Sequence, residues 1–189
     1  MGKTWENIIP NNDVTGFVRN IQVDYVNEDL LFLGTELGVY ITINGGKNWS
    51  RFAKNVPPVA VHYMELQKKT NDLVMGTHGR GVIIIDDISP LREINEKNLE
   101  EKLYFFRNDE FIIQEYGGFS DSFGRETQFF GANSSLSCEI QYLLPKRHTF
   151  GKMTMEIQDM EGNKITTLNP GKSKGINTVS VSYTHLRAH

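Results

Sequence analysis

The first half of the chain alternates short apolar runs with turn residues. Residues 18–25 alternate apolar and polar positions, as a half-buried strand does. The later runs contain β-branched and apolar residues that favour strands over helices, and clusters of Asn, Asp and Gly separate them. The pattern predicts strands at residues 18–25, 30–35, 39–43, 49–52, 59–67, 73–77 and 81–85.

Two of these stretches repeat the same order of residues. Residues 29–41 and residues 72–84 both consist of an apolar run, Gly-Thr, Gly-Val and a second apolar run. Gly34 and Gly76 occupy the same place in the two stretches, about 42 positions apart, and such a period with several short strands per unit is typical of β-propeller blades. The repeat therefore predicts one to two blades in the first half of the chain.

The pattern changes after the second repeat. Ser89 and Pro90 fit the start of a helix, and the charged residues that follow predict one or two short helices. Single strands are expected at residues 103–106 and 110–114, and a loop at the polar, Gly- and Ser-rich residues 117–127. Alternation then returns and predicts strands at residues 138–143, 152–159, 164–168 and 175–179.

Composition narrows the class of protein. The 189 residues hold 20 Lys and Arg against 23 Asp and Glu, for a net charge of −3, so a basic nucleic-acid footprint is not expected. No apolar run approaches the roughly 18 residues of a transmembrane helix. The single Cys138 excludes an internal disulfide and a cysteine-based zinc site. We therefore expect neither a nucleic-acid partner nor a membrane span.

Residues 42–49, Thr-Ile-Asn-Gly-Gly-Lys-Asn-Trp, resemble the Asp-box of BNR repeats, with Asn44 in the place of the usual Asp. Residues 76–92 resemble the closing blade of sortilin-like BNR proteins, and residues 2–5 resemble the end of a preceding box. The resemblance implies a propeller whose upstream blades are missing from this sequence. It also implies a structural role for the box, in which an Asx side chain caps the turn and a Trp packs over it. The box residues are Thr42, Asn44, Gly46 and Trp49.

The second half resembles the Ig-like or FnIII-like sandwich that follows such propellers, and it is similar to the Ig-like module of flagellar hook-capping proteins. The matching pieces are residues 140–143, 155–163 and 175–179. We therefore expect an all-β chain in three parts. These parts are a partial β-propeller over residues 1–88, a helical and loop linker over residues 89–127, and an Ig-like β-sandwich with a truncated last strand over residues 128–180.

Residues 181–189, Val-Ser-Tyr-Thr-His-Leu-Arg-Ala-His, break the pattern before them. The string resembles one reading frame of a transposase-type sequencing adapter. We interpret it as an artefact tail, and its two histidines enter no site hypothesis.

One Gly-rich connection is the candidate binding site. His78 and Arg80 lie in residues 76–81, between two predicted strands, and loops on a rigid scaffold often carry sites. Arg side chains pair with carboxylates and phosphates. The alternative is structural, with Arg80 bonded to carbonyl groups across the sheet and His78 packed against a neighbour. No helix follows these glycines, so they are not a nucleotide-binding fingerprint.

No other residues form a catalytic or metal-binding pattern in the sequence. Asp86 and Asp87 are adjacent, so a continuing strand turns them to opposite faces, and they do not flank one glycosidic bond. One of them is expected to cap the following helix. His62 lies on a predicted strand, which indicates packing in the core or at the rim. We expect no catalytic residue, no metal and no cofactor in this chain.

The expected architecture favours a binding or interaction module, secreted or in the periplasm or cell envelope, with a protein or carbohydrate ligand. The alternative is a fragment of a BNR-containing glycoside hydrolase whose catalytic carboxylates lie in the missing blades. A third interpretation is structural, with the sandwich as an adaptor that carries the propeller. Because two blades do not close a ring, we expect blade faces normally covered by neighbours to be exposed and to associate.

Overall fold

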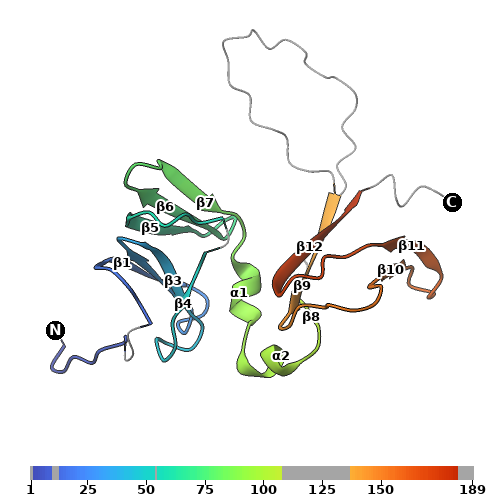
Figure 1. Ribbon diagram of the computed structural model, residues 1–189, viewed down its shortest axis with the longest axis horizontal. Coiled ribbons are helices and arrows are strands. Elements are labelled where there is room, and N and C mark those ends of the chain that lie inside the picture. The colour runs from blue at the N-terminus through green and yellow to red at the C-terminus, as the bar shows by residue number, and fades with distance from the viewer. Residues whose placement is uncertain (1, 10–12, 54, 108–136, 183–189) are drawn as a thin grey trace, which may run out of the picture. The chain divides into compact units, whose positions relative to one another are not determined.

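A computed structural model describes residues 2–9, 13–53, 55–107 and 137–182 of the chain, which divides into two compact units, Met1–Leu99 and Glu100–His189 (Figure 1). Strands dominate both units, and the described helices are short, which confirms the all-β class. The division between the units falls within the predicted linker. Several predicted features lie outside the described residues: the strand at 110–114, the loop at 117–127, the start of the sandwich at 128–136 and positions 183–189 of the tail.

The first unit contains two antiparallel sheets (Figure 1). The first sheet has the order β1 (Val18–Val23), β2 (Leu31–Thr35), β3 (Gly38–Thr42) and β4 (Ser50–Arg51). The second sheet has the order β5 (Val61–Gln67), β6 (Asp72–Thr77) and β7 (Val82–Ile85). Each strand pairs with its neighbour in sequence, so both sheets are meanders, and each strand overlaps a run predicted from the sequence.

The two sheets are built alike down to single hydrogen bonds. The N–H of Glu36 donates to the carbonyl oxygen of Phe17 at 3.2 Å, and the N–H of His78 donates to that of Ala60 at 2.9 Å. In each sheet the preceding threonine hydroxyl donates to a glycine carbonyl, at 3.0 Å in the first sheet and 2.7 Å in the second. The repeated sequence therefore folds into a repeated structure.

A glycine lets the two sheets approach each other closely. Phe32 and Gly34 lie on one face of β2, because side chains alternate along a strand. A Cβ atom added at Gly34 would lie 3.0 Å from the carbonyl oxygen of Val61 and 3.4 Å from Cε of Met64. Phe32, Val61 and Met64 are all buried. The face of the first sheet that carries Gly34 therefore packs on β5 of the second sheet.

The opposite face of the first sheet carries its own apolar cluster. Leu31 and Leu33 lie on this face because they alternate with Phe32 and Gly34 along β2. The cluster consists of the buried residues Leu31, Leu33, Tyr40 and Trp49, with Ile9 and Val14 packed against it. Both faces of β2 are thus buried, which explains the unbroken apolar run at residues 31–33.

A buried ion pair ties helix α1 (Ser89–Glu93) to the sheets. Arg92 donates from Nε and Nη2 to the two carboxylate oxygens of Asp24, each at 2.9 Å, and the Asp24 side chain is 0% exposed. Nη1 of Arg92 donates to Oδ1 of Asn71 at 2.7 Å, and the guanidinium carbon lies 4.8 Å from the centre of the Tyr25 ring. Asp24 follows β1 and Asn71 precedes β6, so one side chain joins the helix to both sheets.

Asp24 remains charged in this buried position. Burial alone would raise the pKa of its carboxyl group, but hydrogen bonds from Arg92 and from the N–H groups of Asn27 and Val26 outweigh burial and lower the pKa below the ordinary 3.8. The two N–H groups lie 2.8 Å and 3.1 Å from Oδ2 of Asp24. A carboxylate with a lowered pKa stabilises the fold above its unfolded pKa, and this contribution is lost as the pH falls through the folded value.

The second unit also contains two sheets (Figure 1). One has the order β12 (Gly175–Ser182), β9 (Ser137–Leu144) and β8 (Tyr104–Phe105), and the other pairs β10 (Met155–Gln158) with β11 (Lys164–Leu168). Helix α2 (Glu96–Glu100) precedes them in the chain. Their strands lie at or near the positions that alternation predicted.

Tyr142 is the centre of the core in the second unit. Tyr142 and Leu144 of β9 cluster with Met155 of β10, so the two sheets share one core. The Tyr142 ring is fully buried, and its hydroxyl donates to the carbonyl oxygen of Gly171 at 2.6 Å. At its far end β12 continues through Val181, the first residue of the predicted artefact tail, which pairs with Cys138.

Replacement of Arg92 tests how much the buried pair stabilises the first unit. We expect Arg92→Met to lower the free energy of unfolding by about 3 kcal/mol, because it leaves the buried Asp24 carboxylate without its partner. Arg80→Met is the matched control, since Arg80 is exposed and its loss should cost no more than about 0.5 kcal/mol. Both tryptophans lie in the first unit, so urea unfolding followed by tryptophan fluorescence measures the difference. Equal losses in the two variants would contradict the prediction.

Acidification tests the charge on Asp24. We expect the wild-type first unit to lose stability as the pH falls from 3.8 toward the lowered pKa of Asp24, because protonation breaks the pair with Arg92. Asp24→Asn has no carboxyl group to titrate there, so it should lose less stability over the same range, from a lower starting point. Urea midpoints at neutral pH and at a series of values below 3.8 give the comparison. Parallel losses in the two proteins would count against this role of Asp24.

Candidate functional site

The hairpin between β3 and β4, which contains the predicted Asp-box, is held together by its own side chains. The hydroxyl of Thr42 donates to Oδ1 of Asn44 at 2.9 Å and accepts from the N–H of Gly46 at 3.1 Å. Oδ1 of Asn44 also accepts from the N–H of Asn48 at 3.0 Å. An amide oxygen accepts these bonds as a carboxylate oxygen would, which explains how Asn44 fits a box that usually carries Asp.

Trp49 closes the hairpin against the segment at residue 8. Its Nε1 donates to the carbonyl oxygen of Ile8 at 2.8 Å, and the side chain is buried. Gly46 has a φ of 92°, and a Cβ atom there would lie 2.9 Å from the same carbonyl oxygen, so no other residue fits without strain. Trp5, the predicted end of a preceding box, is 94% exposed. The box residues thus support the turn, because their bonds join parts of the hairpin to one another or to Ile8.

A groove of about 770 Å³ lies beside the hairpin. Its lining includes Asn44 and Lys47 from the hairpin, and Leu91, Ile94 and Lys97 from the helical segment. Oδ1 of Asn44 already accepts two hydrogen bonds within the turn. The two lysines are exposed, so they remain solvated and do not fix the orientation of a ligand. The groove is therefore the weaker of two candidate sites.

The stronger candidate surrounds His78, whose side chain packs against a second histidine. The rings of His62 and His78 are stacked, with centroids 5.7 Å apart and an interplanar angle of 16°. Both side chains are exposed. The N–H of His78 donates to the carbonyl oxygen of Ala60, which holds the loop against the start of β5. His62, expected at a core or rim position, is thus part of a solvent-facing pair.

Two equivalent β-bulges create this arrangement. On β5 the register changes between Val61 and Tyr63, which leaves His62 as the extra residue of the strand. On β1 it changes between Val18 and Asn20, which leaves Arg19 as the extra residue. A bulge re-aims the side chain of its extra residue out of the regular alternation. In the sequence, alignment of the two repeats on Gly-Thr places Arg19 opposite Val61, so the equivalence of Arg19 and His62 comes from the strand register and not from the sequence.

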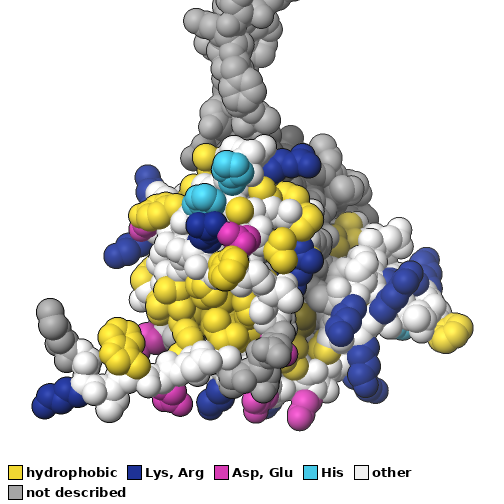
Figure 2. Space-filling view, turned by 60° about the vertical axis from the view of Figure 1, so that its left-hand side comes forward, with side chains coloured by type: hydrophobic (Ala, Val, Ile, Leu, Met, Phe, Trp, Pro, Cys, Tyr) yellow, Lys and Arg dark blue, Asp and Glu magenta, His cyan; other side chains and the backbone are white. Residues whose placement is uncertain are grey.

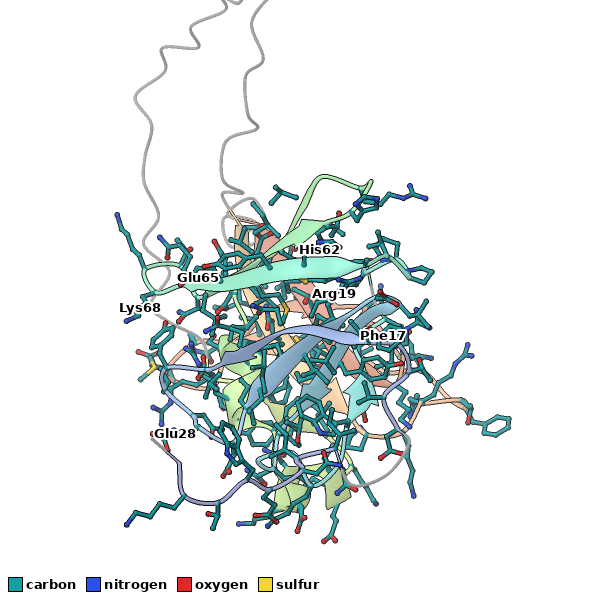
Figure 3. The ribbon with its side chains drawn as sticks, turned by 90° about the vertical axis from the view of Figure 1, so that its left-hand side faces the viewer. Phe17, Arg19, Glu28, His62, Glu65 and Lys68 are labelled. Carbon is teal, nitrogen blue, oxygen red and sulfur yellow. The ribbon has the colours of Figure 1, made fainter. Side chains whose placement is uncertain are left out.

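The bulge on β1 carries an ion pair where the bulge on β5 carries two rings. Arg19 bonds Glu36 through Nη2 and Oε1, and Glu36 holds the position that His78 holds in the other sheet. The two side chains are 45% and 34% exposed, so the pair is well solvated and adds little stability. Phe17, two positions before Arg19 in the sequence, is 76% exposed. Figure 3 shows Arg19 on β1, Phe17 just before that strand, and His62 on the neighbouring β5.

Arg80 stands apart from these contacts. It lies between Gly79 and Gly81, whose φ values are 85° and 66°, and its side chain is exposed. Thr77 closes the loop, since its N–H and hydroxyl both donate to the carbonyl oxygen of Gly81, at 3.0 Å and 2.7 Å. The structure shows no bond from the Arg80 guanidinium to any described residue. The alternative that Arg80 bonds carbonyls across the sheet is therefore not observed within the described part of the chain.

One of the two adjacent carboxylates after β7 bonds the start of helix α1. Asp87 has a φ of 44°, and its Oδ1 accepts from the N–H of Ser89 at 3.1 Å. Ile88 is the N-cap residue, so the helix begins at Ser89 and not after it. Asp86 is exposed. Among the residues that the structure describes, no three His, Cys, Asp or Glu side chains gather in a group suited to a metal ion.

We call Phe17, Arg19, Glu36, His62 and His78 the bulge surface. Figure 2 shows two histidine side chains together at one end of this side of the first unit, with basic and acidic groups beside them and apolar side chains below. The bulge surface offers guanidinium and imidazole donors, one carboxylate acceptor and an exposed aromatic ring. These groups suit the recognition of a polar molecule by hydrogen bonds and ring contact.

Comparisons with known proteins identify no relative of this chain. No protein-family model, no curated protein and no solved structure matches the chain. In the part of the chain that the structure describes, no helix is long and apolar enough to cross a membrane. The bulge surface therefore has to be interpreted from its own chemistry.

Replacement of Asn44 tests the structural role of the Asp-box. We expect Asn44→Ala to lower the free energy of unfolding of the first unit by about 1 to 2 kcal/mol, because it removes the acceptor of two hydrogen bonds. Asn44→Asp keeps an acceptor oxygen and should stay close to the wild type. The matched control is Asn48→Ala, since Asn48 takes part through its backbone N–H. Urea unfolding measures all three variants, and a loss at position 48 equal to that at 44 would refute the assignment.

Proposed function

We propose that the chain is part of a secreted or cell-envelope binding module of the BNR-repeat type, and that the bulge surface binds a carbohydrate that carries carboxylate groups. The observation that best supports this proposal is the pair of equivalent bulges. They turn Arg19 and His62 toward solvent on neighbouring strands. The resemblance of residues 42–49 to an Asp-box supports the BNR-repeat type and the secreted or cell-envelope location.

The chemistry of the bulge surface matches an acidic sugar. A guanidinium bonds a carboxylate through parallel N–H groups, and Arg19 is exposed enough to exchange its bond to Glu36 for one to a ligand. The released Glu36 carboxylate accepts hydrogen bonds from sugar hydroxyl groups. Phe17 presents an exposed ring, and the apolar face of a sugar ring packs on such a side chain.

The scaffold beneath the bulge surface is rigid. β1 and β5 lie side by side, Gly34 brings β2 close to β5, and the pair of Asp24 and Arg92 fixes the far end of β1. Arg19 and His62 belong to two of these packed strands, and groups held by a packed scaffold need little reorganisation when a ligand arrives. The surface is thus held in place before binding, which reduces the entropic cost of binding.

Cleavage of a glycosidic bond would require more than this surface offers. Glycoside hydrolysis commonly uses two carboxyl groups that flank the bond. Glu36 is the carboxylate of the bulge surface, and it is paired with Arg19. The glycoside hydrolase alternative would have to draw its second carboxylate from outside the bulge surface, so we favour binding without bond cleavage.

Titration calorimetry with an oligogalacturonate tests the proposal. We expect the wild-type chain to bind it, and Arg19→Ala to weaken binding about tenfold or more, because a charge-assisted hydrogen bond contributes roughly 1.5 to 3 kcal/mol. His62→Ala should also weaken binding, since it removes one ring of the stacked pair. The matched control is Lys47→Ala, which removes a basic side chain of the same unit at the Asp-box hairpin.

A neutral oligosaccharide of the same length separates charge recognition from sugar recognition. Weaker binding of the neutral sugar is expected, because it lacks the carboxylate that Arg19 recognises. Failure of the wild type to bind either sugar would overturn the proposal. An equal loss in Lys47→Ala and Arg19→Ala would show unspecific attraction instead of a site.

A further inference from the structure

Each sheet of the first unit has two unlike faces. We call the face that carries Gly34 or Gly76 the glycine face, and the opposite one the aliphatic face. The register of the strands defines both faces. On the second sheet the glycine face includes Val74, Gly76, Val82 and Ile84, and the aliphatic face includes Val61, Met64, Leu66, Leu73 and Met75. On the first sheet the aliphatic face includes Val18, Ile21 and Val23 of β1.

Inside the first unit a glycine face already packs on an aliphatic face. Gly34 of the first sheet meets Val61 and Met64 of the second, which are 0% and 1% exposed. Their equivalents on the first sheet are Val18 and Ile21, because both pairs stand at the same places relative to the bulge. Val18 and Ile21 are 47% and 43% exposed. The aliphatic face of the first sheet is thus open along β1. The equivalent part of the aliphatic face of the second sheet, along β5, is covered.

The glycine face of the second sheet is open as well. A Cβ atom added at Gly76 would meet only Tyr63 among the described residues, at 3.8 Å, so no local contact requires a glycine there. Gly76 does not have a positive φ. Glycine weakens a strand, and within one it often marks the close approach of another backbone. Val82 and Ile84 on the same face are 65% and 54% exposed, whereas Val39, the equivalent of Val82, is fully buried.

We infer that the glycine face of the second sheet binds the aliphatic face of the first sheet of a second copy of this chain. The occupant follows from the contact within the first unit, which shows that these two kinds of face fit together. β5 lies against β1 and β2 inside the unit. In the proposed contact, β1 of the incoming copy lies against β5 and β6 in the same way, with Val18 and Ile21 over Gly76.

This contact joins unlike surfaces, so it is heterologous. A pair as a whole keeps one open glycine face, on one copy, and one open aliphatic face, on the other, so further copies add head to tail, either without end or until a ring closes. A self-complementary dimer would stop at two copies. The inference does not rest on carbohydrate binding, because neither open face uses the side chains of Arg19 or His62.

Two variants, each blocking one face, test the inference with the full chain. Sedimentation velocity of the wild type should show association that grows with concentration. Gly76→Arg blocks the glycine face and Ile21→Asp blocks the aliphatic face, so each variant alone should sediment as a monomer. An equimolar mixture of the two should form a dimer and nothing larger, because each variant keeps the face that the other lacks.

Folding of the variants is checked by circular dichroism and urea unfolding. Both positions are open in the first unit, so both variants should unfold near the wild-type midpoint, and Ile84→Asp provides a second block of the glycine face. Gly34→Arg should instead disrupt the unit, because Gly34 is covered by Val61. A wild type that stays monomeric at its highest soluble concentration would overturn the inference. So would a mixture of the two folded variants that stays monomeric.

Discussion

The first unit depends on one buried charge. Asp24 follows β1 and Asn71 precedes β6, and Arg92 bonds both from helix α1. Because the Asp24 carboxylate is removed from water, it has to stay paired, so the helix and the two turns hold one another in a single arrangement. That arrangement fixes one end of β1 relative to the second sheet. The bulges lie at the other end of β1 and β5, so the distance between them depends on this arrangement.

Much of the fold of the first unit could be predicted from sequence because each strand buries at least one face. Burial of one face produces alternation, as along β5, and burial of both produces an apolar run, as along β2. The pair of Arg92 and Asp24 produces no such pattern in the sequence, since the two residues lie 68 positions apart and Arg92 stands in a charged stretch. In the second unit the packing of Tyr142 against Met155 could not be predicted either. Alternation shows where strands lie, but it does not show which sheets pack on each other.

The candidate site was only half predictable. The glycines around residues 76–81 pointed to His78, but its partner His62 depends on a bulge, which changes register without changing residue type. The bonds of Thr42 and Asn44 in the hairpin, in contrast, run within residues 42–48 and follow from local turn chemistry. Sequence reasoning thus finds interactions between near neighbours, and the structure adds those that two strands create when they pair.

The repeat itself separates scaffold from function. Gln67 stands where Asp24 stands and accepts the N–H of Thr70 as Asp24 accepts that of Asn27. Gln67 is exposed, however, and bonds no arginine among the described residues. The turn therefore requires an acceptor oxygen, and the charge of Asp24 serves Arg92. The same comparison applies to the bulges. Both keep the backbone bond to the following loop, whereas the side chains change from an ion pair to two stacked rings. Since the backbone accommodates either pair, the scaffold alone does not determine the choice of side chains, and the ligand binding proposed above would account for it.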